Sequence, residues 1–148
     1  MNYSIGQVSE LFNLPISTLR YYDRQGLFKN MKRSSGQRVF SESELEALRV
    51  IDCLKKSGLE IRDIQHFIDL AVWGAQTYQD RKNMFDRQLD KIEAEIRDLE
   101  KAKAMILFKQ WYYSKSIELG DETLVQAMIP EQLPDEIREA WMKAHDQK

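Results

Sequence analysis

The sequence predicts a mainly α-helical protein: a helix–turn–helix with a small hairpin, then one long helix and a short helical tail. Its 148 residues are 43% hydrophobic and 31% charged, which supplies a core and the polar faces of long helices. Only six glycines and three prolines occur, and apolar residues recur at helical spacing along most of the chain. These features argue against disorder, collagen-like repeats and a β-sandwich.

Residues 4–27 have the pattern of two short helices joined by a turn at Asn13–Pro15. We expect the second helix to begin at Ile16 or Ser17 and to end with Gly26 just beyond its last turn. The apolar residues that share one face of the first helix are Ile5, Val8, Leu11 and Phe12.

Capping-box spacing marks two helix starts, at Ser4 with Gln7 and at Ser41 with Glu44. The helix from Ser41 runs through residue 56 and is closed by a glycine, and a further amphipathic helix covers residues 62 to about 72. Before Ser41, the turn-forming triplet 34–36 indicates a two-stranded hairpin that must lean on a neighbouring helix. The inward positions of the two helices are Leu45, Leu48, Ile51, Leu54, Ile64, Phe67, Ile68 and Ala71.

Residues 76–109 contain neither glycine nor proline, and their apolar side chains follow the heptad spacing of a coiled coil. The d positions are Tyr78, Phe85, Ile92, Leu99 and Ile106, and the a positions include Leu89 and Ile96. A chain cannot bury this seam by itself unless another segment folds back along it. A second copy is the simplest partner, so we predict a homodimer; an intrachain helical hairpin is the alternative.

Beyond the heptads, an aromatic stretch runs up to Gly120. After Pro134, a short helix from Asp135 to about His145 presents Ile137 and Trp141. We therefore expect the tail to end in one amphipathic helix.

Charge is unevenly distributed, although the net charge is only −2. Between Asn13 and Arg38 six basic residues accompany a single acid, Asp23, whereas seven acids and three bases follow from Asp121 onward. A basic N-terminal region beside an acidic tail indicates a polyanionic partner at one end only.

A helical wheel separates the two adjacent tyrosines of the second helix. Leu19 and Tyr22 share the inward face, with Ile16 and Asp23 at its margins. The opposite stripe consists of Ser17, Arg20, Tyr21 and Arg24. This cationic ridge suits the major groove of DNA, where arginine contacts phosphate or guanine. For this helix alone, a solvated face with ordinary salt bridges is the alternative.

The hairpin adds a second basic element close to the helix, because Lys32, Arg33 and Arg38 flank its turn. Phosphate contacts from both elements would supply most of the affinity and make it sensitive to salt. The pattern therefore predicts a winged helix–turn–helix DNA-binding domain.

The stretches YSIGQVSELFNLPISTLRYYDRQGLF and RSSGQRVFSESELEALRVIDCLKKSGLEIRDIQHFIDL resemble the DNA-binding domain of the MerR family of bacterial transcription regulators. The resemblance runs from about Tyr3 to Leu70, and Leu19–Tyr22, Gly26–Leu27 and Gly36-x-Arg38 are its most specific parts. The family's wing usually reads Gly-Tyr-Arg-x-Tyr, and here Gln37 and Phe40 replace both tyrosines.

The resemblance implies DNA contacts in the groove, in the wing and in a second wing formed by the next two helices. The residues expected there are Ser17, Thr18, Arg20, Tyr21, Arg24, Lys32, Arg33, Arg38, Lys56 and Arg62. It also implies a homodimer, paired through an antiparallel coiled coil, on an inverted repeat in double-stranded promoter DNA. An effector would shift the dimer and distort the DNA, which realigns the promoter for RNA polymerase. The corresponding segments are 1–74 for DNA binding, 75–110 for dimerisation and 111–148 as a C-terminal effector or packing segment.

Two groups of residues are candidates for an effector site. Arg49 and Lys56 can share a helix face with the single cysteine, Cys53, which favours its thiolate. Its IDCLKKSGL context resembles family members that sense aldehydes or other electrophiles; a half-buried small hydrophobe is the alternative. The second group is the set of tail aromatics Trp111, Tyr112, Tyr113 and Trp141. These side chains could line a pocket for an apolar or cationic ligand, or pack the tail on the long helix.

Other classes of function find little support in the sequence. We find no Ser/His/Asp set, no glycine loop for phosphate and no cluster of metal ligands, so we expect neither an enzyme nor a cofactor. No cysteine follows Cys53, which disfavours metal sensing. No stretch resembles a signal peptide or a membrane span, and we expect a cytoplasmic protein without a disulfide. The alternative function is a coiled-coil interaction or scaffold protein without effector-dependent DNA activity.

Overall fold

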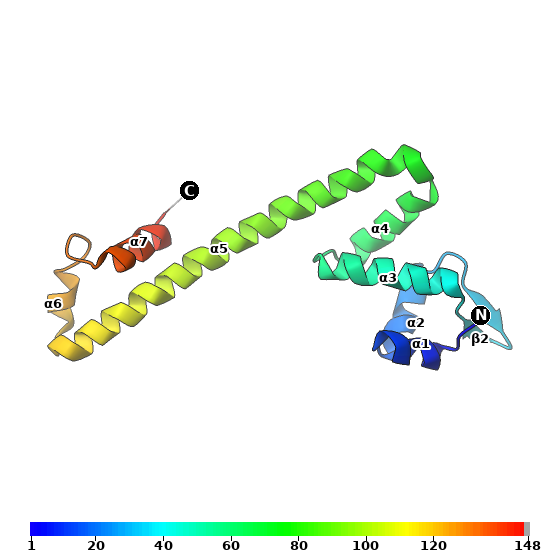
Figure 1. The fold of residues 1–148 in the computed structure, drawn as a ribbon, viewed down its shortest axis with the longest axis horizontal. Helices are drawn as coiled ribbons and strands as arrows, with labels where there is room; N and C mark the ends of the chain where they lie inside the picture. Colours follow the sequence, from blue (N-terminus) through cyan, green and yellow to red (C-terminus); the bar gives the residue numbers. More distant parts are fainter. Residues whose placement is uncertain (147–148) are drawn as a thin grey trace. The chain divides into compact units, whose positions relative to one another are not determined.

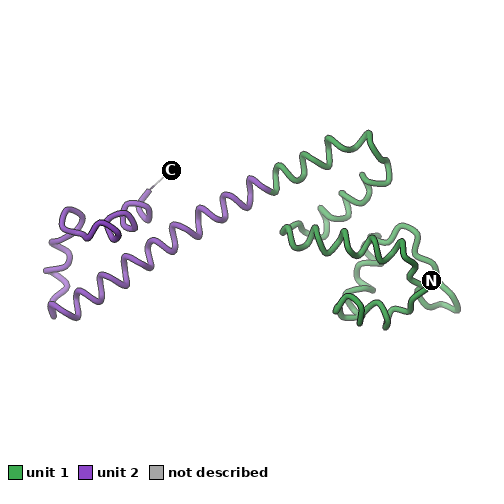
Figure 2. Tube along the Cα trace, viewed as in Figure 1, with its two compact units in different colours: residues 1–88 green, residues 89–148 purple. Residues whose placement is uncertain are grey.

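The computed structural model describes residues 1–146 and divides into two compact units, Met1–Gln88 and a second beginning at Leu89 (Figure 2). The last two residues of the predicted C-terminal segment, Gln147 and Lys148, lie outside the described residues. The fold is mainly α-helical with one two-stranded antiparallel sheet (Figure 1), which confirms the predicted fold class. The segment boundaries at residues 74 and 110 stay predictions.

The first unit contains the predicted helix–turn–helix, hairpin and following helices. In chain order its elements are α1 (Ile5–Phe12), α2 (Ile16–Arg24), β1 (Lys32–Ser34), β2 (Gln37–Val39), α3 (Glu42–Lys56), α4 (Ile61–Val72), the 3₁₀ helix η1 (Gly74–Thr77) and the start of α5 (Tyr78–Leu119). Both predicted capping boxes are present, at Ser4 and at Ser41. Gly26 follows the C-cap of α2 with a φ of 75°, as expected for C′.

The core of the first unit includes the buried faces of three helices. They contribute Val8 of α1, Leu19 and Tyr22 of α2, and the predicted inward leucines and isoleucine of α3. Leu11 and Ala71 are exceptions, since they were expected on the inward faces of α1 and α4 but are exposed. Ile5, Val8 and Phe12 lie within about 60° of one another on the helix, whereas Leu11 falls about 100° from Phe12. An eight-residue helix has room to bury only that narrow stripe.

The hairpin β1–β2, which we call the wing (residues 32–39), pairs Lys32 with Val39, Arg33 with Arg38 and Ser34 with Gln37. Ser35 and Gly36 both have positive φ at its turn, as tight hairpins require. The chain after β2 is tied to the N-terminus, because Phe40 exchanges backbone hydrogen bonds with Tyr3. This tie holds the base of the wing beside α1.

The second unit contains the rest of α5, then α6 (Glu122–Gln126) and α7 (Asp135–Ala144). The aromatic stretch was expected to lie outside the long helix, but α5 runs through it to Leu119 and stops only before Gly120. Aromatic residues are weak helix formers, and their packing against the tail overrides that preference. The short helix α6 was not expected, whereas α7 was.

The tail packs on one face of α5, and its core consists of Phe108, Tyr112, Val125 and Leu133. Leu99 precedes Phe108 by nine residues, which is about 180° around a helix, so the heptad seam lies on the opposite face. Accordingly Leu99 is 70% and Ile106 is 60% exposed. The tail of the second unit therefore does not cover the seam, and the intrachain hairpin is wrong as an explanation of these heptads.

Candidate nucleic-acid interface

Helix α2 presents the two tyrosines as the wheel predicted. Tyr22 is 2% exposed and belongs to the core with Leu19, whereas Tyr21 is 40% exposed. Ser17, Arg20 and Arg24 lie at the surface on the same side as Tyr21, and Thr18 is half-buried beside them. The exposed stripe of α2 is thus available to a partner, while the buried stripe anchors the helix.

Tyr22 is anchored by a contact that the local sequence does not indicate. The Lys55 Nζ of α3 donates a hydrogen bond of 3.0 Å to the Tyr22 hydroxyl, and the same ammonium lies 5.6 Å from the ring centroid. A buried phenol retains a polar partner in this way. The contact links the buried face of α2 to α3.

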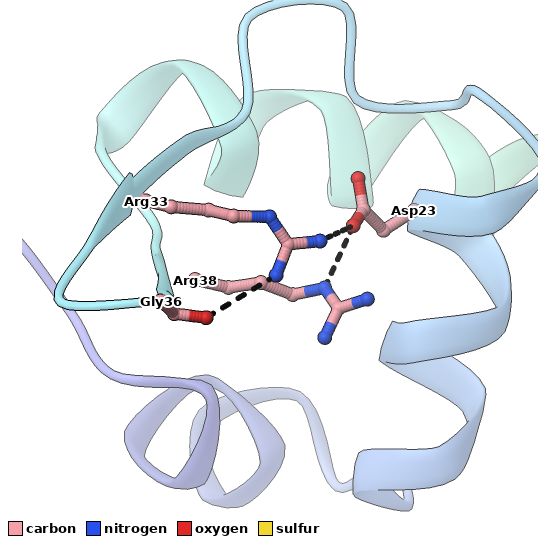
Figure 3. A network of polar contacts seen from close by, with 4 residues as sticks. All are labelled: Asp23, Arg33, Gly36 and Arg38. Atoms are coloured by element: carbon pink, nitrogen blue, oxygen red, sulfur yellow. Dashed lines mark hydrogen bonds and ion pairs between the residues drawn. The ribbon is translucent and has the colours of Figure 1, made fainter.

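A carboxylate joins α2 to both strands of the wing (Figure 3). The Arg38 Nε on β2 donates to the Asp23 Oδ2 over 2.7 Å, and an Nη of Arg33 on β1 lies 3.4 Å from the same oxygen. Arg33 also donates, over 3.4 Å, to the carbonyl of Gly36 at the turn. The side chains of Asp23 and Arg38 are only 14% and 16% exposed, so this pair is largely shielded from water.

The other predicted contact residues are surface cations. Lys32 is exposed on β1. Lys56 pairs with Asp52 at 2.8 Å and Arg62 with Glu60 at 3.7 Å, on either side of the turn between α3 and α4. The hydrogen bond from Lys56 to Asp52 is the main reason that the pKa of Lys56 is raised. Both pairs are exposed, so they are weak and can exchange for phosphate.

A hollow of about 250 Å³ lies between the start of α1, helix α2 and the wing. Its lining consists of Ser4, Ile5, Arg20, Gly36, Gln37 and Arg38. Two arginines therefore face one small concave surface. Such a surface favours an anion.

Among residues 1–146 no group of three His, Cys, Asp or Glu side chains is placed to hold a metal ion. In the same range no helix is long and apolar enough to cross a membrane.

The two candidate effector groups differ in their surroundings. Cys53 is exposed on α3, which rules out the half-buried hydrophobe. Its neighbouring cations are already paired, Arg49 with Glu46 and Lys56 with Asp52.

The tail aromatics behave differently. Tyr112 is in the core of the second unit with Trp111 and Trp141 packed against it, as the packing alternative predicted. Tyr113 is exposed. An effector role for either group stays a prediction.

Comparison with known proteins identifies the family to which the helix–turn–helix and wing belong. Residues 3–70 match the family described as MerR HTH family regulatory protein, and residues 45–107 match the family described as MerR, DNA binding. The chain belongs to the MerR family. It is a DNA-binding transcriptional regulator, as the motifs of α2 and the wing indicated.

Individual MerR relatives agree with this assignment. An uncharacterised HTH-type transcriptional regulator of Haemophilus influenzae is 29% identical over 136 residues, which cover 91% of this chain and 98% of that protein. The regulator AdhR of Bacillus subtilis is 37% identical over 82 residues, covering 55% of this chain and 59% of AdhR. These relatives are named as regulators of transcription rather than as enzymes.

Two solved MerR structures are similar in fold. HiNmlR, a MerR family regulator lacking the sensor domain and solved bound to promoter DNA, is 29% identical with a TM-score of 0.61, covering 84% of this chain and 99% of its own. A MerR family regulator from Bacillus thuringiensis is 40% identical with a TM-score of 0.57, covering 74% of this chain and 96% of its own.

Proposed function

We propose that this MerR family member acts as a homodimer that binds an inverted repeat in a promoter, each α2 entering a major groove and each wing lying on the flanking backbone. The exposed apolar seam of α5 is the observation that carries the proposal. Between Leu89 and Ile106 its apolar side chains recur at heptad spacing, and the tail packs on the other face of the helix. Leu89, Ile96, Leu99 and Ile106 are exposed, and Ile92 is half-buried. Exposed apolar surface of this extent favours a partner.

The seam also extends further than the heptads of residues 76–109. Because α5 continues to Leu119, Tyr113 and Ile117 keep the same four-three spacing and are exposed. Phe85, at the other end, contacts the ring of Phe67 edge-on with centroids 5.6 Å apart, so it supports both its own unit and the seam. The members proposed for the dimer are Phe85, Leu89, Ile92, Ile96, Leu99 and Ile106. In the antiparallel pairing expected of the family, the seam holds two DNA-binding units at a fixed spacing.

Replacing Leu99 with lysine tests the dimer. We expect Leu99→Lys to sediment as a monomer at concentrations where the parent protein is a dimer, because a charge replaces a side chain in the middle of the seam. Leu124→Lys is the matched control, since Leu124 is also an exposed leucine but lies on α6. If Leu99→Lys remains a dimer, the proposed seam is not the interface.

The DNA part of the proposal is tested by footprinting the region that flanks the gene, with binding followed as salt rises. We expect two protected half-sites related by two-fold symmetry and a steep loss of affinity with salt. A distortion between the half-sites would link the dimer to RNA polymerase indirectly, through promoter geometry. Absence of binding to any duplex in dilute salt would instead support the scaffold alternative.

For the effector we propose the thiol of Cys53 rather than the tail aromatics. The thiol is exposed on α3, and Lys56 lies one turn away. Cys53 contributes to the raised pKa of Lys56, although Asp52 contributes more. In the proposed step the thiolate adds to an electrophilic carbon and the product takes a proton from water. Unchanged induction of the target promoter by an aldehyde series in Cys53→Ser would contradict this proposal.

A further inference from the structure

Asp23 is the one acid in the basic region between Asn13 and Arg38, and it lies on the helix that is proposed to enter the major groove. A carboxylate there repels the phosphates that the surrounding cations attract. Its surroundings explain why it is tolerated. It is only 14% exposed and is paired with cations of the wing rather than directed into solvent.

We propose that Asp23 is a positioning residue for DNA binding: it holds Arg38 and the wing so that Arg38 and Arg20 together receive one backbone phosphate. This inference rests on the proposed mode of DNA binding. It assigns a role to Asp23 and a phosphate position to the hollow lined by Arg20, Arg38 and the start of α1.

The donors of Arg38 support this role. A guanidinium has five N–H donors, and Asp23 engages the one on Nε. In Figure 3 the contact to Asp23 is drawn from the Nε of Arg38, and no contact is drawn from either of its Nη atoms. The four N–H groups on these atoms are the ones that grip a phosphate in two-pronged fashion. Pairing through Nε therefore orients the arginine without using that edge.

The wing needs such a support. A two-stranded hairpin is marginal by itself, and its orientation depends on what it leans on. Arg33 and Arg38 are opposite each other in the β1–β2 register, and both contact the same oxygen of Asp23. One carboxylate thus ties both strands to α2 and sets the distance between groove contacts and wing contacts.

The test compares Asp23→Asn with the matched control Glu46→Gln, which removes one acid from an exposed ion pair in the same unit. Each protein is titrated against the duplex that the parent protects in footprinting and against a random duplex of equal length, over a range of salt. Net charge alone predicts that both variants bind slightly tighter. If Asp23 positions Arg38, Asp23→Asn should lose about tenfold affinity for the protected duplex, and its affinity should depend less steeply on salt concentration. Glu46→Gln should show neither change.

Arg38→Gln shows whether Asp23 acts through that arginine. We expect the double variant Asp23→Asn/Arg38→Gln to bind no more weakly than Arg38→Gln alone. Additive losses in the double variant, or an Asp23→Asn protein that keeps its affinity and salt slope, would overturn the inference. If Asp23→Asn unfolds below the assay temperature, the parent protein is tested instead through the ¹⁵Nε–H signal of Arg38. The inference requires this N–H to stay protected from hydrogen exchange when DNA binds, and loss of the protection would overturn it. A parent that binds no duplex would refute the proposed function itself, which is a separate result.

Discussion

Replacing each of the two adjacent tyrosines of α2 separates stability from DNA binding. Tyr22→Ala removes a side chain that is 2% exposed, and such aromatic-to-alanine changes in a core cost about 3–5 kcal/mol. The lost hydrogen bond from Lys55 adds little, since Lys55 is at the surface and regains water. Tyr22→Phe isolates that bond and should cost about 0.5–1.5 kcal/mol.

Tyr21 should show the opposite pattern. Because it is 40% exposed and outside the core, Tyr21→Phe should leave the free energy of unfolding within about 0.5 kcal/mol of the parent value. If its hydroxyl contacts a phosphate, duplex affinity should fall about fivefold, which corresponds to about 1 kcal/mol.

The assay is urea unfolding followed by circular dichroism at one fixed protein concentration, because the stability of a dimer depends on concentration. Duplex titration of the same samples gives the second measurement. A Tyr22→Ala protein as stable as the parent, or a Tyr21→Phe protein that loses several kcal/mol, would show that the faces of α2 are assigned the wrong way round.

Three further changes probe the turn, a cap and the second core. Gly36→Val places a β-branched residue at a φ of 77°, which should cost about 1–2 kcal/mol and weaken duplex binding through the wing; equal melting and binding would contradict this. The pKa of Asp121 is lowered because Thr123 donates to its carboxylate, so its stabilising effect is present above about pH 4 and is lost as pH falls further. Asp121→Asn keeps a capping oxygen but should remove this part of the pH dependence of melting below about pH 4. Phe108→Ala should destabilise the tail by about 3–5 kcal/mol and expose it to protease in limited digestion, with Leu124→Ala as the surface control.

Several elements of this protein depend on local chemistry and could be predicted from neighbouring residues alone. The capping boxes at Ser4 and Ser41, the end of α2 at Gly26 and the opposite faces of Tyr21 and Tyr22 follow from spacing and backbone preference over a few residues. The heptads of α5 follow from a periodicity that persists over many turns, which is why the exposed seam could be predicted. These features involve neighbours in sequence, so no knowledge of distant contacts is needed.

Other features depend on partners far apart in the chain, and they became visible in the folded structure. The sequence marked Asp23 as a single acid among bases, but its pairing with Arg33 and Arg38 requires the wing to fold beside α2. The continuation of α5 through Trp111–Tyr113 depends on a tail that packs against it and outweighs weak local preference. Leu11 has the right spacing for the core, yet a narrow helix contact leaves it exposed. In each case the free energy comes from a contact between distant segments, and local sequence does not specify which segments meet.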